Sequence, residues 1–145
     1  MEYSAGRCAR CFVVRFDHDE DFLESLKSLA KKENITTAWF WCLGAVKQTD
    51  IVTGPEKTQI PPIPMWHTVK EAHELVAIGN ISTLDGETVL HLHAGFGRGN
   101  ETSFGCARKK ALTYLTVECF IQEVCDINFV REKNDDLKIN PISFK

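Results

Sequence analysis

The chain has 145 residues, of which 43% are hydrophobic, so it is long and apolar enough for one domain with a hydrophobic core. Its formal net charge of -3 at pH 7 excludes the global attraction to nucleic acid that a strongly basic protein shows, so any such partner must be argued locally. The sequence has neither a run of 18 apolar residues nor the apolar N-terminal core of a secretory signal, so we expect a cytoplasmic protein without a membrane partner.

The first predicted elements are a strand and an amphipathic helix. Residues 9–16 place Phe12, Val14 and Phe16 at every second position, which is the period of a strand. Residues 19–35 have apolar side chains at helical spacing, acids in the first turn, lysines in the last turn and Asn34 as the expected end. Capping and the helix dipole explain the acidic opening better than a cation site does. We expect an N-terminal arm over residues 1–9 and a folded domain over residues 10–130.

Strand-forming residues continue after the helix. The segments "TTAWFWCLGAV" and "TDIVTG" predict two strands on either side of Gly44 and Ala45. Residues 55–66 contain four of the five prolines and therefore cannot lie in a central ladder, because proline donates no backbone hydrogen bond. We expect a loop or an excursion at the sheet edge there.

The segment "HELVAIGNISTLDGETVLHLHAGF" predicts a β-hairpin with its turn at Asp85-Gly86, a dipeptide that suits the positive φ angles of such a turn. A turn centred there places Asn80 opposite His91 and Ile78 opposite His93. One face is apolar or small, and we expect it to pack against the helix: Leu75, Ala77, Gly79, Ile81, Leu90, Leu92 and Ala94. The opposite face is mixed: Glu74, Val76, Ile78, Asn80, Val89, His91 and His93.

The remaining sequence predicts strand and then a polar tail. Beyond the bend "GRGNETS", residues 104–130 are rich in strand formers and predict one or two further strands. Residues 131–145 are polar, and we expect this tail to extend loosely from the domain.

The pair His91 and His93 is the strongest candidate for chemistry in the sequence. Residues two apart on a strand project to the same side, so two imidazoles are preorganised to chelate a metal ion. Cys106 on the next strand is a candidate third ligand, and this donor set suits zinc better than calcium or magnesium. Asn80 and Glu74, on the same face, are candidates to orient the rings. The alternative is two half-buried imidazoles beside a small core cysteine, and the spacing alone does not decide between them.

The other cysteines point to reduced thiols. All six, Cys8, Cys11, Cys42, Cys106, Cys119 and Cys125, lie in a chain too large and too apolar to depend on disulfides. The C-x-x-C spacing of Cys8 and Cys11 stands alone, so we interpret these two as arm and strand residues rather than as a metal or redox motif.

The order of these segments resembles the PPC domain, the plants and prokaryotes conserved domain of predicted DNA-binding proteins. The resemblance runs from about Arg10 to Phe129 through "RCFVVRF", the acidic-capped helix, "WCLGAV", "ELVAIGNISTLDGETVLHLHAGFG" and a final "GC". It implies an α+β fold, an antiparallel sheet flanked by one main helix, and a homotrimer. It also implies a metal site, usually zinc, formed by the H-x-H pair and a histidine after a glycine. Here Cys106 follows Gly105 in place of that histidine.

Three functions follow from these observations. The first is a metal-stabilised trimeric binding or regulatory module, associated with DNA through Arg98, Arg108, Lys109 and Lys110, although a solvated strand end explains those charges as well. The second is a hydrolase-like, metal-dependent enzyme that uses the open fourth position of a His2Cys zinc site, with Glu74 as general base. Sequence motifs of the known zinc hydrolases and deaminases are absent, so we place catalysis below binding. In the third, the metal is purely structural, with or without a small molecule bound nearby.

Overall fold

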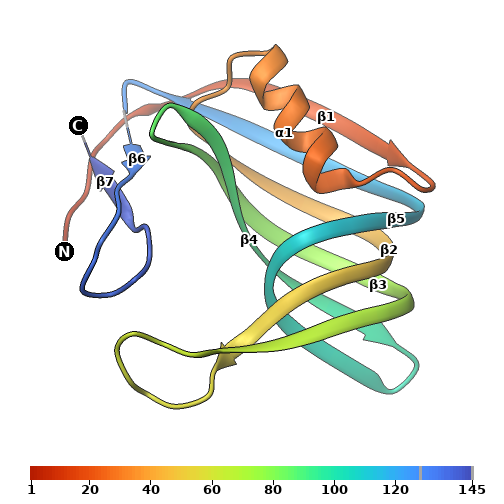
Figure 1. Ribbon diagram of the computed structural model, residues 1–145. Helices are drawn as coiled ribbons and strands as arrows, with labels where there is room; N and C mark the ends of the chain where they lie inside the picture. Colours follow the sequence, from red (N-terminus) through yellow and green to blue (C-terminus); the bar gives the residue numbers. More distant parts are fainter. Residues whose placement is uncertain (128, 145) are drawn as a thin grey trace.

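The computed structural model describes residues 1–127 and 129–144 and shows one mixed, mainly antiparallel sheet with a single short helix (Figure 1). The elements are, in order, β1 (Arg7–Asp17), α1 (Phe22–Lys32), β2 (Ala38–Pro55), β3 (Pro64–Leu84), β4 (Glu87–Arg98), β5 (Glu101–Cys125), β6 (Phe129–Arg131) and β7 (Ile142–Phe144). The predicted sheet flanked by one helix is confirmed. Among the described residues, none belongs to a helix with the length and apolar character needed to cross a membrane.

Strands β2, β3, β4 and β5 close on one another. The sheet order is β1-β5-β2-β3-β6-β7, and β4 pairs with both β3 and β5. The ring of pairings β5-β2-β3-β4-β5 is antiparallel throughout, whereas β3 and β6 pair in parallel. Because the sheet curls back on itself, one face becomes an enclosed interior and the other faces outward.

Helix α1 forms where its sequence pattern predicts it. Asp21 is the N-cap, and its Oδ1 accepts hydrogen bonds from the backbone N–H of Leu23 at 3.2 Å and of Ala111 on β5, also at 3.2 Å. The helix ends before Asn34, which has a left-handed φ of 55°, and the N–H of Ile35 then donates to the carbonyl of Ala30 at 2.8 Å. The capping carboxylate therefore fixes the helix start to the sheet.

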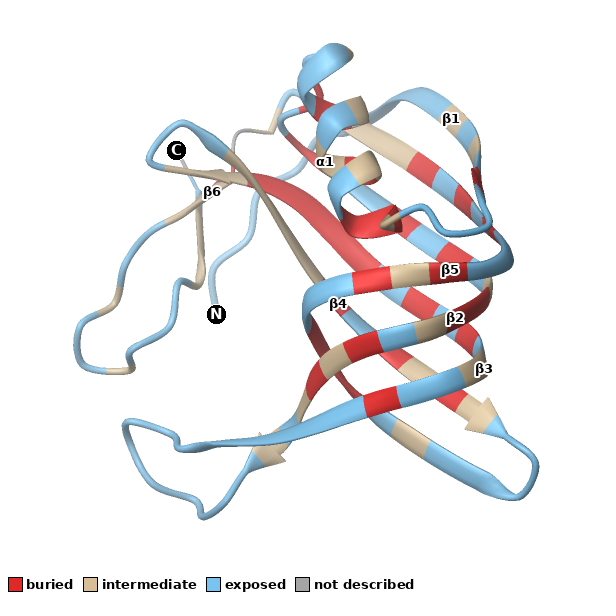
Figure 2. Ribbon diagram, turned by 45° about the vertical axis from the view of Figure 1, so that its right-hand side comes forward, coloured by how far each residue is buried: buried red, intermediate tan, exposed pale blue. Residues whose placement is uncertain are grey.

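The hydrophobic core lies between α1 and the enclosed face of the sheet (Figure 2). The helix contributes four buried residues, Phe22, Leu23, Leu26 and Ala30. The face of β3 and β4 predicted to meet the helix is indeed buried, apart from Leu90, which is half-buried. Position 79 on this face requires glycine, because a Cβ there would stand 2.6 Å from the carbonyl oxygen of His91 and would overlap the ring of Phe40.

Strand β2 differs from the prediction. Two strands are expected around Gly44 and Ala45, but Ala38–Pro55 is one continuous strand. Its pairing with β3 and β5 shifts register between Val46 and Gln48, so β-bulges bend the strand where the sequence predicts a break. The loop between β2 and β3 covers residues 56–63, which is shorter than the predicted 55–66, and Pro55 and Pro64 pair with each other where the two strands meet the loop.

The β3–β4 hairpin confirms the predicted register. Asp85 and Gly86 have φ angles of 51° and 83°, as the turn requires, and Asn80 pairs with His91 and Ile78 with His93. Turn chemistry and side-chain alternation therefore determine this hairpin locally.

The polar tail is a structural part of the sheet, and the expectation that it extends loosely is wrong. Phe129, Val130 and Arg131 of β6 pair with β7, and Arg131 pairs with Leu84 of β3. The reason is a set of polar contacts from Arg131 that sequence periodicity does not show, described below. The division of the chain at residues 9 and 130 stays a prediction.

Candidate metal centre

Strands β4 and β5 bring the three predicted ligands together. His91 and His93 leave the same side of β4, and antiparallel pairing places Cys106 of β5 directly opposite His93. One ligand atom from each of these three residues lies within 4.8 Å of the other two. The rings of His91 and His93 have centroids 5.2 Å apart and are nearly perpendicular, at 80°. Strand alternation sets the first two positions and strand pairing the third.

This donor set fits a zinc ion. Zinc in proteins binds imidazole nitrogen and thiolate sulfur at roughly 2.0–2.3 Å, which puts tetrahedral donors roughly 3.5 Å apart. The three atoms within 4.8 Å therefore need only small side-chain rotations to share one ion. Two nitrogens and one sulfur also suit zinc better than calcium or magnesium, which prefer oxygen donors.

The electrostatic surroundings of the cluster favour an uncharged His91 ring and a protonated Cys106 thiol when no metal is bound. Burial lowers the pKa of His91 to about 4, and the charges of Arg131, His93 and Arg108 act in the same direction. Burial raises the pKa of Cys106, against the opposing effects of Arg108, the Leu92 backbone amide and Arg131. At neutral pH the His91 ring therefore keeps a free lone pair, and a metal ion must displace the Cys106 proton.

Asn80 and Arg131 form a polar support beside the cluster. Asn80 is buried opposite His91, as predicted, and its Oδ1 accepts a hydrogen bond from Arg131 Nη2 at 2.9 Å. Arg131 Nε also donates to Ser82 Oγ at 3.0 Å, and Nη1 donates to the Asn140 carbonyl at 2.8 Å. Sequence reasoning missed Arg131 because it lies in a polar segment far from the histidines, and no spacing connects them.

Glu74, the second residue expected to orient the rings, is not brought to the cluster. It pairs with Gly97 on β4, whereas Ile78, four residues further along β3, is the residue that pairs with His93. Four residues of strand correspond to roughly 13 Å. Glu74 lines a separate pocket at the other end of the hairpin. The same placement removes it as a candidate general base.

The four basic residues considered for nucleic acid do not form one group. Arg98 lies at the β4–β5 turn, opposite Glu101, while Arg108, Lys109 and Lys110 lie further along β5. Lys109 Nζ stands 3.9 Å from an Asp50 carboxylate oxygen and 5.1 Å from the centre of the Trp66 ring. Arg108 instead lines pockets beside the metal cluster.

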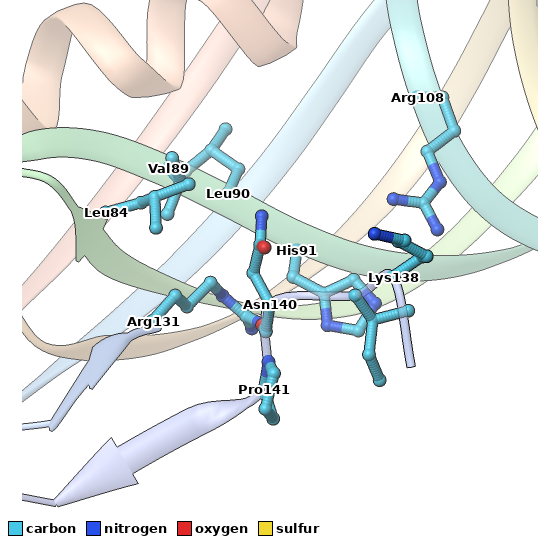
Figure 3. Close-up of a pocket in the computed structure, with 10 residues that line it drawn as sticks. Leu84, Val89, Leu90, His91, Arg108, Arg131, Lys138, Asn140 and Pro141 are labelled. Atoms are coloured by element: carbon cyan, nitrogen blue, oxygen red, sulfur yellow. The ribbon is translucent and has the colours of Figure 1, made fainter. Parts of the chain in front are cut away.

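Two pockets border the cluster. The first, of about 500 Å³, is lined by His91, Arg108, Arg131 and Lys138 among others, and we call it the basic pocket (Figure 3). The second, of about 440 Å³, is lined by His93 and Cys106, and we call it the proline pocket because three further lining residues are Pro55, Pro62 and Pro64.

An exposed apolar surface surrounds His93 on the outward face of the sheet. We call it the outer face, and it consists of Trp41, Leu43, Val76, Ile78, Phe104 and Phe120. Ile78 pairs with both Trp41 and His93, and the Phe104 ring lies 5.8 Å from that of His93. The exposed fractions of Val76 and Ile78 are 71% and 48%. Contiguous apolar side chains of this kind mark an interaction surface.

Cys8 and Cys11 lie on β1, where a bulge separates them, and both are exposed. In the described part of the chain, the cluster of possible metal ligands contains neither of them.

Comparisons with known proteins agree with the fold. The family model of the Plants and Prokaryotes Conserved (PCC) domain matches residues 3–125. A metal-containing protein from Archaeoglobus fulgidus superposes with a TM-score of 0.85 at 18% identity, covering 97% of this chain and 98% of that chain. A plant- and prokaryote-conserved (PPC) protein from Pyrococcus horikoshii gives 0.82 at 25% identity, covering 96% and 97%. A protein from Bacteroides thetaiotaomicron, named as a "putative dna binding protein", gives 0.80 at 22% identity, covering 96% and 97%. Comparison with curated proteins finds no significant match.

Proposed function

We propose that this chain, which belongs to the Plants and Prokaryotes Conserved (PCC) domain family, is a metal-binding protein in which His91, His93 and Cys106 hold one zinc ion. The observation that carries the proposal is the convergence of three ligand atoms within 4.8 Å from two neighbouring strands. The metal-containing relative from Archaeoglobus fulgidus, which has the same fold, supports it.

The role assigned to the metal is binding and cross-linking. An ion held by β4 and β5 joins the two strands at the point where the sheet closes, and three protein ligands leave a fourth position open for a further ligand. A hydrolase would also need a group to accept a proton. Among the described residues that line the basic and proline pockets, none is a carboxylate. We therefore place ligand binding before hydrolysis.

Elemental analysis of purified protein tests this function most directly. The expected result is close to one zinc ion per chain in the wild type, and far less in Cys106→Ser. The matched control is Cys8→Ser, which replaces an exposed cysteine outside the cluster and should retain the metal. A chain that takes up no zinc when zinc is supplied in excess would refute the proposal.

The outer face supports self-association, and the form we propose is the homotrimer. Its exposed side chains form an apolar patch of a kind that monomeric proteins seldom leave open to water. Ile78→Glu places a charge in this patch and should reduce the mass measured by light scattering to that of one chain. Ile60→Glu, in the loop between β2 and β3, is the control, because Ile60 is 69% exposed and lies outside the sheet. A wild-type protein with the mass of a single chain would contradict the trimer.

DNA is a second candidate partner, supported by the name of the Bacteroides thetaiotaomicron relative. In this chain Arg108, Lys109 and Lys110 would supply the phosphate contacts, and three copies would multiply them. Contacts with phosphate release counterions, so binding to duplex DNA must weaken steeply between about 50 and 200 mM salt. Titration of duplex DNA at both salt concentrations tests this, and undetectable binding at the lower one excludes DNA as a partner.

A further inference from the structure

The basic pocket and the proline pocket lie on two sides of the metal-ligand cluster and share part of their walls. His91 lines the first, and His93 and Cys106 line the second. Arg108, Lys138 and Ile139 line both. The pockets are therefore neighbours around one centre, and each is of the size that holds a small molecule, roughly 300–1,000 Å³.

Positive charge in the basic pocket is not neutralised by its own walls. Three cationic side chains line it, and among its described lining residues none carries a carboxylate. In Figure 3, Arg131 lies on one side of His91, and Arg108 and Lys138 lie on the other. Lys138 Nζ stands 3.8 Å from an Asp135 carboxylate oxygen, but Asp135 itself does not line the pocket.

The guanidinium groups of Arg108 and Arg131 have no carboxylate partner among the described residues. All three side-chain hydrogen bonds of Arg131 end on neutral oxygens, from Ser82, Asn80 and the backbone of Asn140. These bonds position the Arg131 fork beside His91 and leave its charge in place. Within the described ranges, the Arg108 side chain has no hydrogen-bond or ion-pair partner. Arg108 and Arg131 line the same pocket, so their charges repel each other. Burial lowers the pKa of Arg131, Cys106 opposes this shift, and the charge of Arg108 adds to it.

The proline pocket shares two of these cations, Arg108 and Lys138, and adds apolar walls. Besides the two metal ligands and the shared cations, its walls include Val52, Phe104 and the prolines of the β2–β3 loop. A ligand that spans both pockets would therefore meet cations at one end and apolar side chains at the other.

We propose that the two pockets together bind a small organic anion, whose carboxylate or phosphate group is held by Arg108, Arg131 and Lys138 and whose apolar part lies in the proline pocket. Guanidinium groups match such oxyanions with paired hydrogen bonds, and an anion offsets the repulsion between the two arginines. The inference rests on the proposed function in one respect, because a zinc ion at the cluster would add a further positive charge next to the same group.

The experiment titrates the full chain with benzoate, inorganic phosphate and uncharged benzamide in 0.15 M NaCl. Isothermal titration calorimetry gives the affinity, and the arginine Nε–H signals in NMR spectra report the place of binding. Zinc-loaded and chelator-treated protein are both used. Arg108→Gln removes an exposed cation of the pocket, and Arg98→Gln is the control with the same charge change at the distant β4–β5 turn.

We expect one of the two anions to bind saturably, to shift the NMR signals of Arg108 and Arg131 and to bind more tightly than benzamide. The affinity of this anion should be higher for the zinc-loaded protein than for the chelator-treated protein. The ligand carries a carboxylate if benzoate binds and a phosphate if inorganic phosphate binds. Arg108→Gln should weaken binding at least about tenfold, as expected for a hydrogen bond between charged groups. Arg98→Gln should leave the affinity unchanged.

Three results would overturn the inference: neither anion binds, benzamide binds equally well, or both variants lose the same affinity. A change of oligomeric mass in Arg108→Gln without a change in affinity would also overturn it, because the arginine would then serve subunit contacts. Failure of the metal proposal looks different. Chelator-treated and zinc-treated protein would then bind the anion equally, and elemental analysis would find no zinc.

Discussion

Zinc should stabilise the folded chain by an amount that depends on Cys106. The perturbation is removal of zinc with a chelator, followed by its return at a known free concentration. The cluster exists only when β4 and β5 are paired, because His93 and Cys106 are opposite residues of that pairing and are 13 positions apart in sequence. The unfolded chain therefore has no comparable site, and binding favours the folded state.

The size of the effect follows from mass action. At a free zinc concentration one hundred times the dissociation constant, binding to the folded state alone adds about 2.7 kcal/mol to the free energy of unfolding. Unfolding entropy is about 2.1 cal/mol/K per residue, which for 145 residues is about 0.3 kcal/mol/K. The midpoint of thermal unfolding should therefore rise by about 9 °C.

Differential scanning calorimetry with and without zinc measures this shift. Cys106→Ser replaces the sulfur ligand with a hydroxyl at a position that is 4% exposed, which changes the stability of the metal-free protein as well. The informative quantity is therefore each variant's own zinc-dependent shift. It should fall to near zero in Cys106→Ser and remain about 9 °C in Cys8→Ser. An equal shift in both variants would show that the ion binds elsewhere, and the proposed ligand set would be wrong.

Three further predictions concern the scaffold around the site. Gly79→Ala should lower the free energy of unfolding by about 1–3 kcal/mol, because a methyl group there overlaps an aromatic ring and the β4 backbone. The control is Gly97→Ala, which should change the free energy of unfolding little because a Cβ there meets no atom within 4 Å. Urea unfolding measures both variants. Leu26→Ala, at a fully buried helix position, should cost about 2–5 kcal/mol in the same assay, and a cost below that of Gly97→Ala would show that the helix does not cover the core. The hydrogen bond from Arg10 lowers the pKa of Glu123. This pair therefore stabilises the fold above the ordinary glutamate pKa, and the stabilisation is lost as the pH falls through the lowered pKa. Glu123→Gln should lower the midpoint of thermal unfolding at pH 7 and leave it unchanged at about pH 2.

The sequence determined the features that depend on near neighbours along the chain. Helix α1 follows from a periodic apolar stripe and an Asp cap. The hairpin register follows from Asp85-Gly86 and the alternation of apolar and polar residues on both strands. The same alternation places His91 and His93 on one side of β4, so two of the three candidate ligands are apparent from the amino-acid order alone. Each of these properties is set by interactions within a few residues or across one tight turn.

The tertiary structure decided what lies beside the two histidines. Cys106 stands opposite His93 because the β4–β5 turn is centred on Gly99-Asn100, with Arg98 opposite Glu101; the glycine-rich bend offers more than one place for a turn, and only the structure shows which one is used. Arg131 reaches Asn80 from a segment whose composition predicts a loose tail. Glu74 is a different case, because the predicted hairpin register already places it four residues along the strand from Ile78, the partner of His93. Side-chain period fixes the side of a strand on which a residue lies, but position along and across the sheet depends on long-range pairing. For this reason the imidazole pair is evident in the sequence, whereas the neighbouring cations and the two pockets exist only once the sheet has closed.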